Sequence, residues 1–326
     1  MRWKEIRRPL VAYIVLFLTR CLGVIPICCT YILGRLLGCL AYAVSWRERA
    51  RAIRHLEEFY GERLGPREIR RIAKGVFEHF ACAVMELLAL RSPEKFLNRL
   101  SVSIEEVDSV LKELEQGRGC LLVTGHIGNW ELMAAYFARQ GYSVHVVARP
   151  MRDPIFQKIV DRHRDACGLH VHYTKGEGGM SMVRVLRRGD VLALLIDVRT
   201  EGEGRWVEFL GRPAYTLVGP AALAAHTGAS VVFAYSVRTR PWAYRFVFHP
   251  VLRVDPPVDR SGPEWENYVG QLLGSLNARL SAVIEQYPEQ WMWMHRRHDP
   301  IRPDRRPNRS IEHPLKQFPG GAGEVL

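Results

Sequence analysis

The 326-residue sequence lacks the short motifs of several enzyme and binding classes. Its seven cysteines form no C-x-x-C pair and follow no regular spacing, which excludes a disulfide framework and a zinc knuckle. G-x-S-x-G, H-E-x-x-H and the P-loop pattern are missing, so the sequence does not indicate a serine hydrolase, a zinc protease or a P-loop nucleotide-binding protein. At 48% hydrophobic and 25% charged residues the chain is not disordered. We therefore expect a large core, no metal, no cofactor and a reducing compartment.

Acidic residues are scarce at the start of the chain. Residues 1–54 hold ten Lys or Arg but two acidic residues, so most of the net charge of +12 belongs to this segment. No groove-reading or base-stacking motif accompanies these charges, which argues against a nucleic-acid partner. Basic clusters beside an apolar segment are instead attracted to anionic lipid headgroups. The sequence predicts an anionic membrane surface as a partner.

An apolar stretch runs from Pro9 to Trp46 and is interrupted by Arg20 and Arg35. Its longest uncharged run, Cys21–Gly34, has 14 residues, whereas a membrane-spanning helix needs about 20 apolar residues. We expect either one span near Cys21–Leu40, with an arginine reaching the headgroups, or a hairpin in one leaflet. A buried helical hairpin of a soluble domain is the alternative. Residues 1–46 are thus predicted to be an N-terminal membrane-anchoring segment.

Beyond Arg47 the pattern is first helical and then alternates between short apolar runs and amphipathic segments. This alternation predicts an α/β fold with a mainly parallel sheet flanked by helices. We expect one domain over residues 47–300 and a loosely held tail over 301–326, which is rich in Pro, Arg and Gly. The expected strands are Cys120–Thr124, Val144–Ala148, Val191–Ile196, Ser230–Tyr235 and Tyr244–Phe248, and later helices are expected near Leu217–His226 and Trp265–Ile284.

The segment from Thr124 to Glu131, TGHIGNWE, is the densest concentration of chemistry in the chain. It falls where an apolar strand ends and a helix begins, which is where open α/β sheets place ligands. His126 suits general-base work, and Glu131 in the first helical turns is expected to reach back to the imidazole Nδ1. The pair would be a base oriented by an acid, without a protein nucleophile. A capping turn with an incidental histidine is the alternative.

This motif and later blocks resemble the bacterial late acyltransferases of lipid A biosynthesis, within the lysophospholipid acyltransferase superfamily. The resemblance extends from about residue 10 to 300. It includes Asp197 as the first acid of a D-Q-D segment, although this chain has Arg199 in place of the second acid. The matching blocks are GHIGNWE, Arg149-Pro150, Arg162-His163-Arg164, Phe209–Gly219, Thr227–Ala229 and the closing signature Tyr287–Arg297.

The resemblance implies a glycerolipid acyltransferase-like fold at the cytoplasmic face of a bacterial inner membrane. It implies transfer of an acyl chain from an acyl carrier protein thioester to a hydroxyl of a phosphorylated glycolipid, a lipid A precursor, with His126 and Glu131 as catalytic residues. The alternatives are another glycolipid or a lysophospholipid as the acceptor, and coenzyme A in place of the carrier protein as the donor. A non-catalytic membrane scaffold of the same fold is the alternative from a different functional class. Backbone amides near Gly128 or an arginine are expected to stabilise the oxyanion.

Three residues outside the motif are candidates for substrate binding. Arg149 and Arg164 suit a phosphate group because a guanidinium binds it in a two-pronged geometry. Asp197, at the end of a strand, is expected to position an arginine or the acceptor. The alternative for each arginine is a solvated surface charge. The tryptophans of the closing signature, Trp291 and Trp293, are expected in the core more readily than in an acyl groove.

Overall fold

The computed structural model describes residues 27–90, 93–151, 153–174, 178–198, 202–252, 254–260 and 262–297. The first 26 residues, Arg199 and the predicted tail lie outside these ranges. The helices are α2 (Ile27–Val44), α3 (Trp46–Tyr60), α4 (Pro66–Ala89), α5 (Pro93–Leu97), α6 (Asp108–Glu115), α7 (Trp130–Arg139), α8 (Pro154–Cys167), α9 (Gly178–Arg187), α10 (Gly219–Thr227), α11 (Gly262–Gln286) and the 3₁₀ turn Pro288–Gln290.

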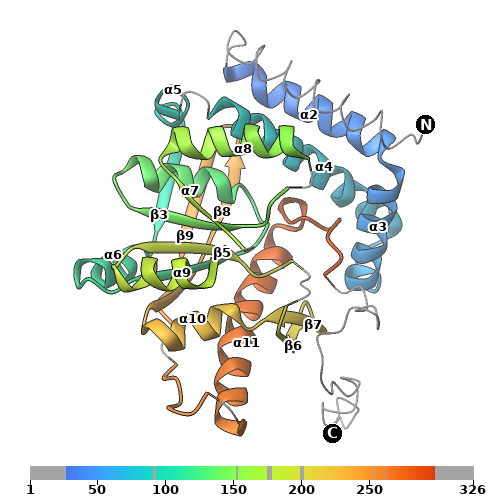
Figure 1. Cartoon of the computed structure of the whole chain (residues 1–326). Helices are drawn as coiled ribbons and strands as arrows, with labels where there is room; N and C mark the ends of the chain where they lie inside the picture. Colours follow the sequence, from blue (N-terminus) through green and yellow to red (C-terminus); the bar gives the residue numbers. More distant parts are fainter. Residues whose placement is uncertain are drawn as a thin grey trace, which may run out of the picture.

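Within the described ranges, seven strands form one sheet in the order β1-β9-β8-β2-β5-β3-β4 (Figure 1). All neighbours pair in parallel except β8 and β9, so the predicted mainly parallel α/β sheet is confirmed. A separate antiparallel hairpin, β6 with β7, was not expected from the sequence. The strands are β1 (Ser101–Glu105), β2 (Cys120–Thr124), β3 (Val144–Ala148), β4 (His170–Tyr173), β5 (Val191–Leu195), β6 (Gly204–Phe209), β7 (Arg212–Leu217), β8 (Ser230–Arg240) and β9 (Ala243–Phe248).

Both faces of the central strand β2 are buried. Successive side chains of a strand point to opposite faces. In β2, Leu121 and Val123 join a core cluster with α4, α10 and α11, whereas Cys120 and Leu122 join a second cluster with α7. This explains why β2 is a continuous apolar run rather than an alternating one. Strand β2 is buried up to its last residue, Thr124, so the turn that follows it begins in the interior of the protein.

The α2 helix packs lengthwise against α4 at the top of Figure 1. Two glycines allow the close approach: a Cβ on Gly34 would lie 2.8 Å from the Cys82 Cα, and one on Gly38 would lie 2.4 Å from the Glu78 Cα. The other side of α2 exposes a stripe of large apolar side chains, spaced by four residues, which we call the α2 stripe. It consists of Ile32, Leu36, Leu40 and Val44, each 58–65% exposed.

The predicted membrane span is not seen as one helix. In the part of the chain that the structure describes, no single helix is both long and apolar enough to cross a membrane. Cys29–Val44 and Trp46–Tyr60 meet that test as a pair, but the chain bends by 91° between them. Much of the predicted Cys21–Leu40 span lies in α2, which packs on α4, and its first residues lie outside the described ranges.

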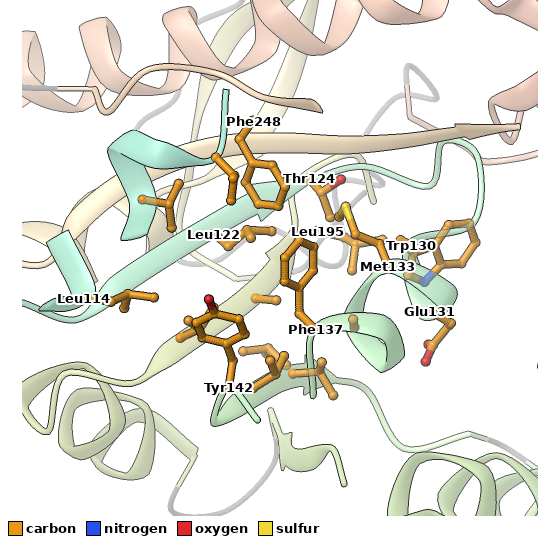
Figure 2. A pocket seen from close by; sticks show the side chains of 18 of the residues that line it. Leu114, Leu122, Thr124, Trp130, Glu131, Met133, Phe137, Tyr142, Leu195 and Phe248 are labelled. Carbon is orange, nitrogen blue, oxygen red and sulfur yellow. The ribbon is translucent and has the colours of Figure 1, made fainter. Parts of the chain in front are cut away.

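A narrow apolar pocket lies between α7 and the sheet (Figure 2). Its volume is about 70 Å³. Leu114 and Tyr142 lie at one end, and Trp130 and Glu131 lie at the other. The pocket thus runs along the sheet from the start of β3 to the carboxyl edge, where the residues of the TGHIGNWE motif lie.

Candidate active site

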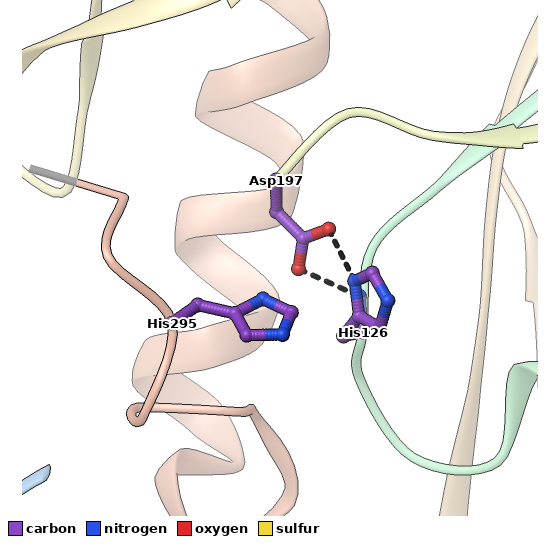
Figure 3. Close-up of side chains that lie close together, drawn as sticks. All are labelled: His126, Asp197 and His295. Carbon is purple, nitrogen blue, oxygen red and sulfur yellow. Dashed lines mark hydrogen bonds and ion pairs between the residues drawn. The ribbon is translucent and has the colours of Figure 1, made fainter. Parts of the chain in front are cut away.

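Two neighbouring strands bring His126 and Asp197 together. His126 follows β2, and Asp197 follows β5, its parallel partner in the sheet. The imidazole Nδ1 donates to Asp197 Oδ1 at 2.8 Å, and the His126 backbone N–H donates to Oδ2 at 2.7 Å (Figure 3). This double contact orients both the ring and the turn that carries it. With the proton held on Nδ1, Nε2 keeps the lone pair that a general base needs.

The Asp197 carboxylate is fully buried yet charged. Burial alone raises the pKa of a carboxyl group, but the charge of His126 and the hydrogen bonds from its side chain and backbone outweigh burial and lower the Asp197 pKa well below its usual range. Trp291 Nε1–H donates a third hydrogen bond to Oδ2 at 2.8 Å. Asp197 thus lies behind the imidazole with its oxygens engaged, rather than at the substrate position expected from the sequence.

The closing signature packs directly on the motif turn. Gly128 N–H donates to the Gln290 carbonyl at 2.9 Å, and Ile127 pairs with Trp291 in an isolated bridge. Gly128 has a φ of +60°, and a Cβ there would lie 1.6 Å from the Ser236 carbonyl oxygen, so glycine is required. The Gly128 amide is therefore not available for an oxyanion, contrary to one expectation from the sequence.

Trp291 and Trp293 are each 1% exposed, so the expectation that they belong to the core is confirmed. His295 from the same signature lies against His126, with ring centroids 4.6 Å apart. Burial, followed by the charge of His126, lowers the pKa of His295 to about 4, so this ring is neutral at physiological pH. The signature thus supplies two buried indole rings and the half-buried imidazole of His295.

Glu131 does not reach His126 as expected. Its carboxylate accepts two hydrogen bonds from Arg164 on α8, at 2.5 Å to Nη2 and 3.1 Å to Nε. The side chains of both residues are largely buried, at 16% and 12% exposed. The physical reason is position: Glu131 lies in the first turn of α7 beside α8, whereas the Nδ1 of His126 faces the end of β5. The predicted His–Glu pair is replaced in the structure by a His126–Asp197 pair and a separate Glu131–Arg164 pair.

A large cavity of about 1220 Å³ opens in front of His126. Its wall is mostly apolar, but Arg149 and Arg164 line it together with His126 and Glu131. Arg149 is exposed at the rim, whereas Arg162 is an exposed residue of α8 that does not line this cavity. Trp130, Glu131, Val147, Arg164 and Leu195 line both this cavity and the narrow apolar pocket.

A buried polar cluster behind the turn was missed by the sequence analysis. Arg238 on β8 pairs with Glu86 on α4 at 2.7 Å, and Glu86 accepts a hydrogen bond from Asn129 at 2.8 Å. His79 donates from Nε2 to the Gly128 carbonyl at 3.0 Å and accepts from Arg238 at Nδ1. Burial and the Arg238 charge lower the pKa of His79 to about 3. Because these residues lie far apart in sequence, no local spacing could have linked them.

Two other histidines, His163 and His172, make their hydrogen-bond contacts in different parts of the chain. His163 is buried and contacts the Ile159 and Leu88 carbonyls, and His172 contacts His145 at the sheet edge. Within the described ranges, His126, Asp197 and His295 form a group whose ligand atoms lie within 4.8 Å of one another. No metal was expected from the sequence, and no local spacing brings these three residues together.

The chain is similar in sequence to acyltransferases of two mycobacterial species. The phosphatidylinositol mannoside acyltransferase of Mycobacterium tuberculosis strain H37Rv is 25% identical over 287 residues, covering 77% of this chain and 85% of the relative. The enzyme of that name from Mycolicibacterium smegmatis is 26% identical over 210 residues, covering 62% and 65%.

A crystal structure of the 1-acyl-sn-glycerophosphate acyltransferase of Thermotoga maritima covers 79% of this chain and 98% of its own, with 14% identity and a TM-score of 0.35. A likeness at that score adds nothing to the assignment. The model of the bacterial lipid A biosynthesis acyltransferase family, in contrast, matches residues 3–299. The chain therefore belongs to this acyltransferase family.

Proposed function

We propose that this protein moves a fatty acyl chain from a thioester donor to a hydroxyl of a phosphorylated glycolipid, with His126 as the general base. One observation carries the proposal: Asp197 holds the His126 Nδ1 at 2.8 Å while the same imidazole lines a cavity of about 1220 Å³. A base held in one tautomer and facing space for a substrate is the arrangement that proton abstraction requires.

In this mechanism, His126 Nε2 accepts the acceptor's hydroxyl proton as its oxygen attacks the thioester carbonyl carbon. The tetrahedral intermediate collapses as the carbon–sulfur bond breaks, and the imidazolium returns the proton to the leaving thiolate. The ester forms and the base is regenerated, so no protein nucleophile is consumed. Asp197 stabilises the transient imidazolium because its buried carboxylate keeps its negative charge next to Nδ1.

Glu131 and Arg164 serve the site in another way. Since the Gly128 amide already donates to Gln290, we assign the stabilisation of the oxyanion to an arginine. Arg164 lines the cavity with His126 and is held there by two hydrogen bonds to Glu131. Glu131 thus positions the cation rather than the base, and it keeps a role in catalysis through Arg164.

The narrow pocket suits the hydrocarbon end of the acyl chain. Its lining is almost wholly apolar, and five of its residues also line the main cavity. Burying each methylene group contributes about 0.8 kcal/mol. A chain threaded from the main cavity between Trp130 and Leu195 would place its thioester near His126. The main cavity then holds the thioester and the acceptor headgroup.

The acceptor proposal rests on the relatives and on the cationic rim. The family is named for lipid A biosynthesis, and the curated relatives are phosphatidylinositol mannoside acyltransferases. Both names denote phosphorylated glycolipids, and Arg149 at the cavity rim suits their phosphate. We retain the lipid A precursor as first candidate and a phosphatidylinositol mannoside as second. A lysophospholipid is the third.

Placement at an anionic membrane, at its cytoplasmic face, is also part of the proposal. The α2 stripe exposes four large apolar side chains, and exposed arginines such as Arg35 and Arg47 lie on the same part of the chain. An apolar face flanked by cations is the pattern of a helix lying in the membrane interface. Because α2 packs along α4, we propose that it lies in the plane of the surface.

The deciding experiment is acyl transfer by the purified full-length protein in vesicles that contain anionic lipid. Acyl carrier protein and coenzyme A thioesters are each offered with a lipid A precursor, a phosphatidylinositol mannoside and a lysophospholipid, and products are identified by mass spectrometry. We expect transfer from the carrier protein to a glycolipid, reduced by about 10²–10⁴-fold in His126→Ala. His170→Ala, at an exposed histidine of β4, is the control. Equal rates for the folded His126→Ala variant and the wild type would refute the mechanism.

A further inference from the structure

His295 is a half-buried group of this site that the mechanism does not use. Its buried Nδ1 has no hydrogen-bond partner among the described residues. In Figure 3 the ring lies beside Asp197 and His126, on the side of the carboxylate away from β2. An unpaired buried nitrogen is costly, so a ligand that pairs with it is favoured, and a metal ion does this at the Nδ1 lone pair of the Nε2–H tautomer.

The surroundings of His295 offer further ligand atoms. One atom each from His126, Asp197 and His295 lies within 4.8 Å of the other two, and the His126 Nδ1 and Asp197 Oδ1 are 2.8 Å apart. Two imidazoles and a carboxylate, with water in a fourth position, make a common open zinc site. Metal-bound carboxylates are usually hydrogen-bonded as well, and Trp291 Nε1–H already donates to Asp197.

We propose that His126, Asp197 and His295 form an inhibitory site for a divalent zinc ion. If the ion binds at Nδ1, the single N–H proton of the His126 ring moves from Nδ1 to Nε2, so Nε2 no longer offers a lone pair. If it binds at Nε2 instead, it occupies the basic lone pair directly. In either case His126 can no longer accept a proton from the acceptor hydroxyl. This inference concerns the same residues as the proposed acyl transfer, but metal binding itself does not depend on that activity.

Two measurements on the full-length protein test the site. Calorimetric titration with Zn²⁺ alone, and with Co²⁺ while recording visible absorption, should show one ion bound per chain with the spectrum of a four-coordinate site. Acyl transfer should fall as Zn²⁺ is raised through the micromolar range and recover on chelation. His295→Gln removes one ligand, so both the affinity and the inhibition should weaken by at least about tenfold.

The matched control is His170→Ala, which removes an exposed histidine of the sheet edge and should leave zinc affinity and inhibition unchanged. If His295→Gln does not fold by circular dichroism, Asp197→Asn replaces it in the binding titration. Absence of a bound ion in the wild type, or equal zinc affinity in wild type and ligand variants, would overturn the site. A protein that binds zinc in this way but transfers no acyl group would overturn the proposed function and leave the site standing.

Discussion

Replacing Asp197 with asparagine tests which carboxylate serves the base. Oδ2 accepts from two donors, the His126 backbone N–H and Trp291, so the amide oxygen of the introduced side chain should take that place. The amide NH₂ then faces His126 Nδ1, which must become an acceptor. The ring proton moves to Nε2, and the base lacks a lone pair toward the cavity.

The size of the effect follows from this tautomer change. General-base assistance contributes about 10²–10⁴-fold, or roughly 3–5 kcal/mol of transition-state stabilisation. The corresponding substitution in serine proteases lowers kcat about 10⁴-fold for the same reason. We therefore expect Asp197→Asn to reduce kcat by about 10²–10⁴-fold and to change KM little, because the carboxylate does not line the cavity.

The matched comparison is Glu131→Gln. Its carboxylate contacts Arg164 and not His126, so we expect a smaller loss of kcat than in Asp197→Asn. Steady-state kinetics with the acyl donor varied would separate the two, with circular dichroism confirming that both variants fold. If Asp197→Asn stays within about threefold of the wild type while Glu131→Gln loses about 10²-fold or more, the assignment of Asp197 is wrong.

Other parts of the structure carry further predictions. Ala193→Leu fills part of the narrow pocket, so it should shift donor preference to shorter acyl chains by about fourfold per excluded methylene. Competition between thioesters of different length measures this preference. An unchanged preference would show that the acyl chain does not bind in this pocket. The double variant Leu36→Glu and Leu40→Glu should weaken vesicle binding at least about tenfold. Glutamates at the exposed positions Asn267 and Gln271 of α11 add the same charge and should not weaken it. Equal effects of the two double variants would show that the α2 stripe does not bind the membrane. The pKa values of His295 and His79 are lowered to about 4 and about 3, so the unfolded chain binds more protons than the folded one below about pH 6.5. Stability should thus fall by several kcal/mol as the pH drops from about 6.5 to 4, as measured by urea unfolding, and His295→Gln should flatten that slope.

Local patterns were sufficient to predict the central strands and the helices beside them. Cys120–Thr124 and Val144–Ala148 are strands with the predicted bounds, because a strand buried on both faces reads as a continuous apolar run. The strand β4, His170–Tyr173, was not predicted, because it is short and polar and its partner β3 is distant in sequence. The β6–β7 hairpin was likewise not predicted. Its segment was matched to a block of the family, and the alternation of apolar and polar residues along it was not used.

The sequence by itself determined where His126 lies. An apolar strand ending in Gly-His-x-Gly places His126 at the carboxyl edge of the sheet, and this requires information from neighbouring residues alone. Its partner could not be determined in this way. Glu131 is five residues away and Asp197 is 71 residues away, yet the parallel pairing of β2 with β5 brings Asp197 to the imidazole, while α8 brings Arg164 to Glu131. Spacing along a chain limits only local contacts. Which carboxylate contacts His126 depends on strand order, and only the tertiary structure decides that order.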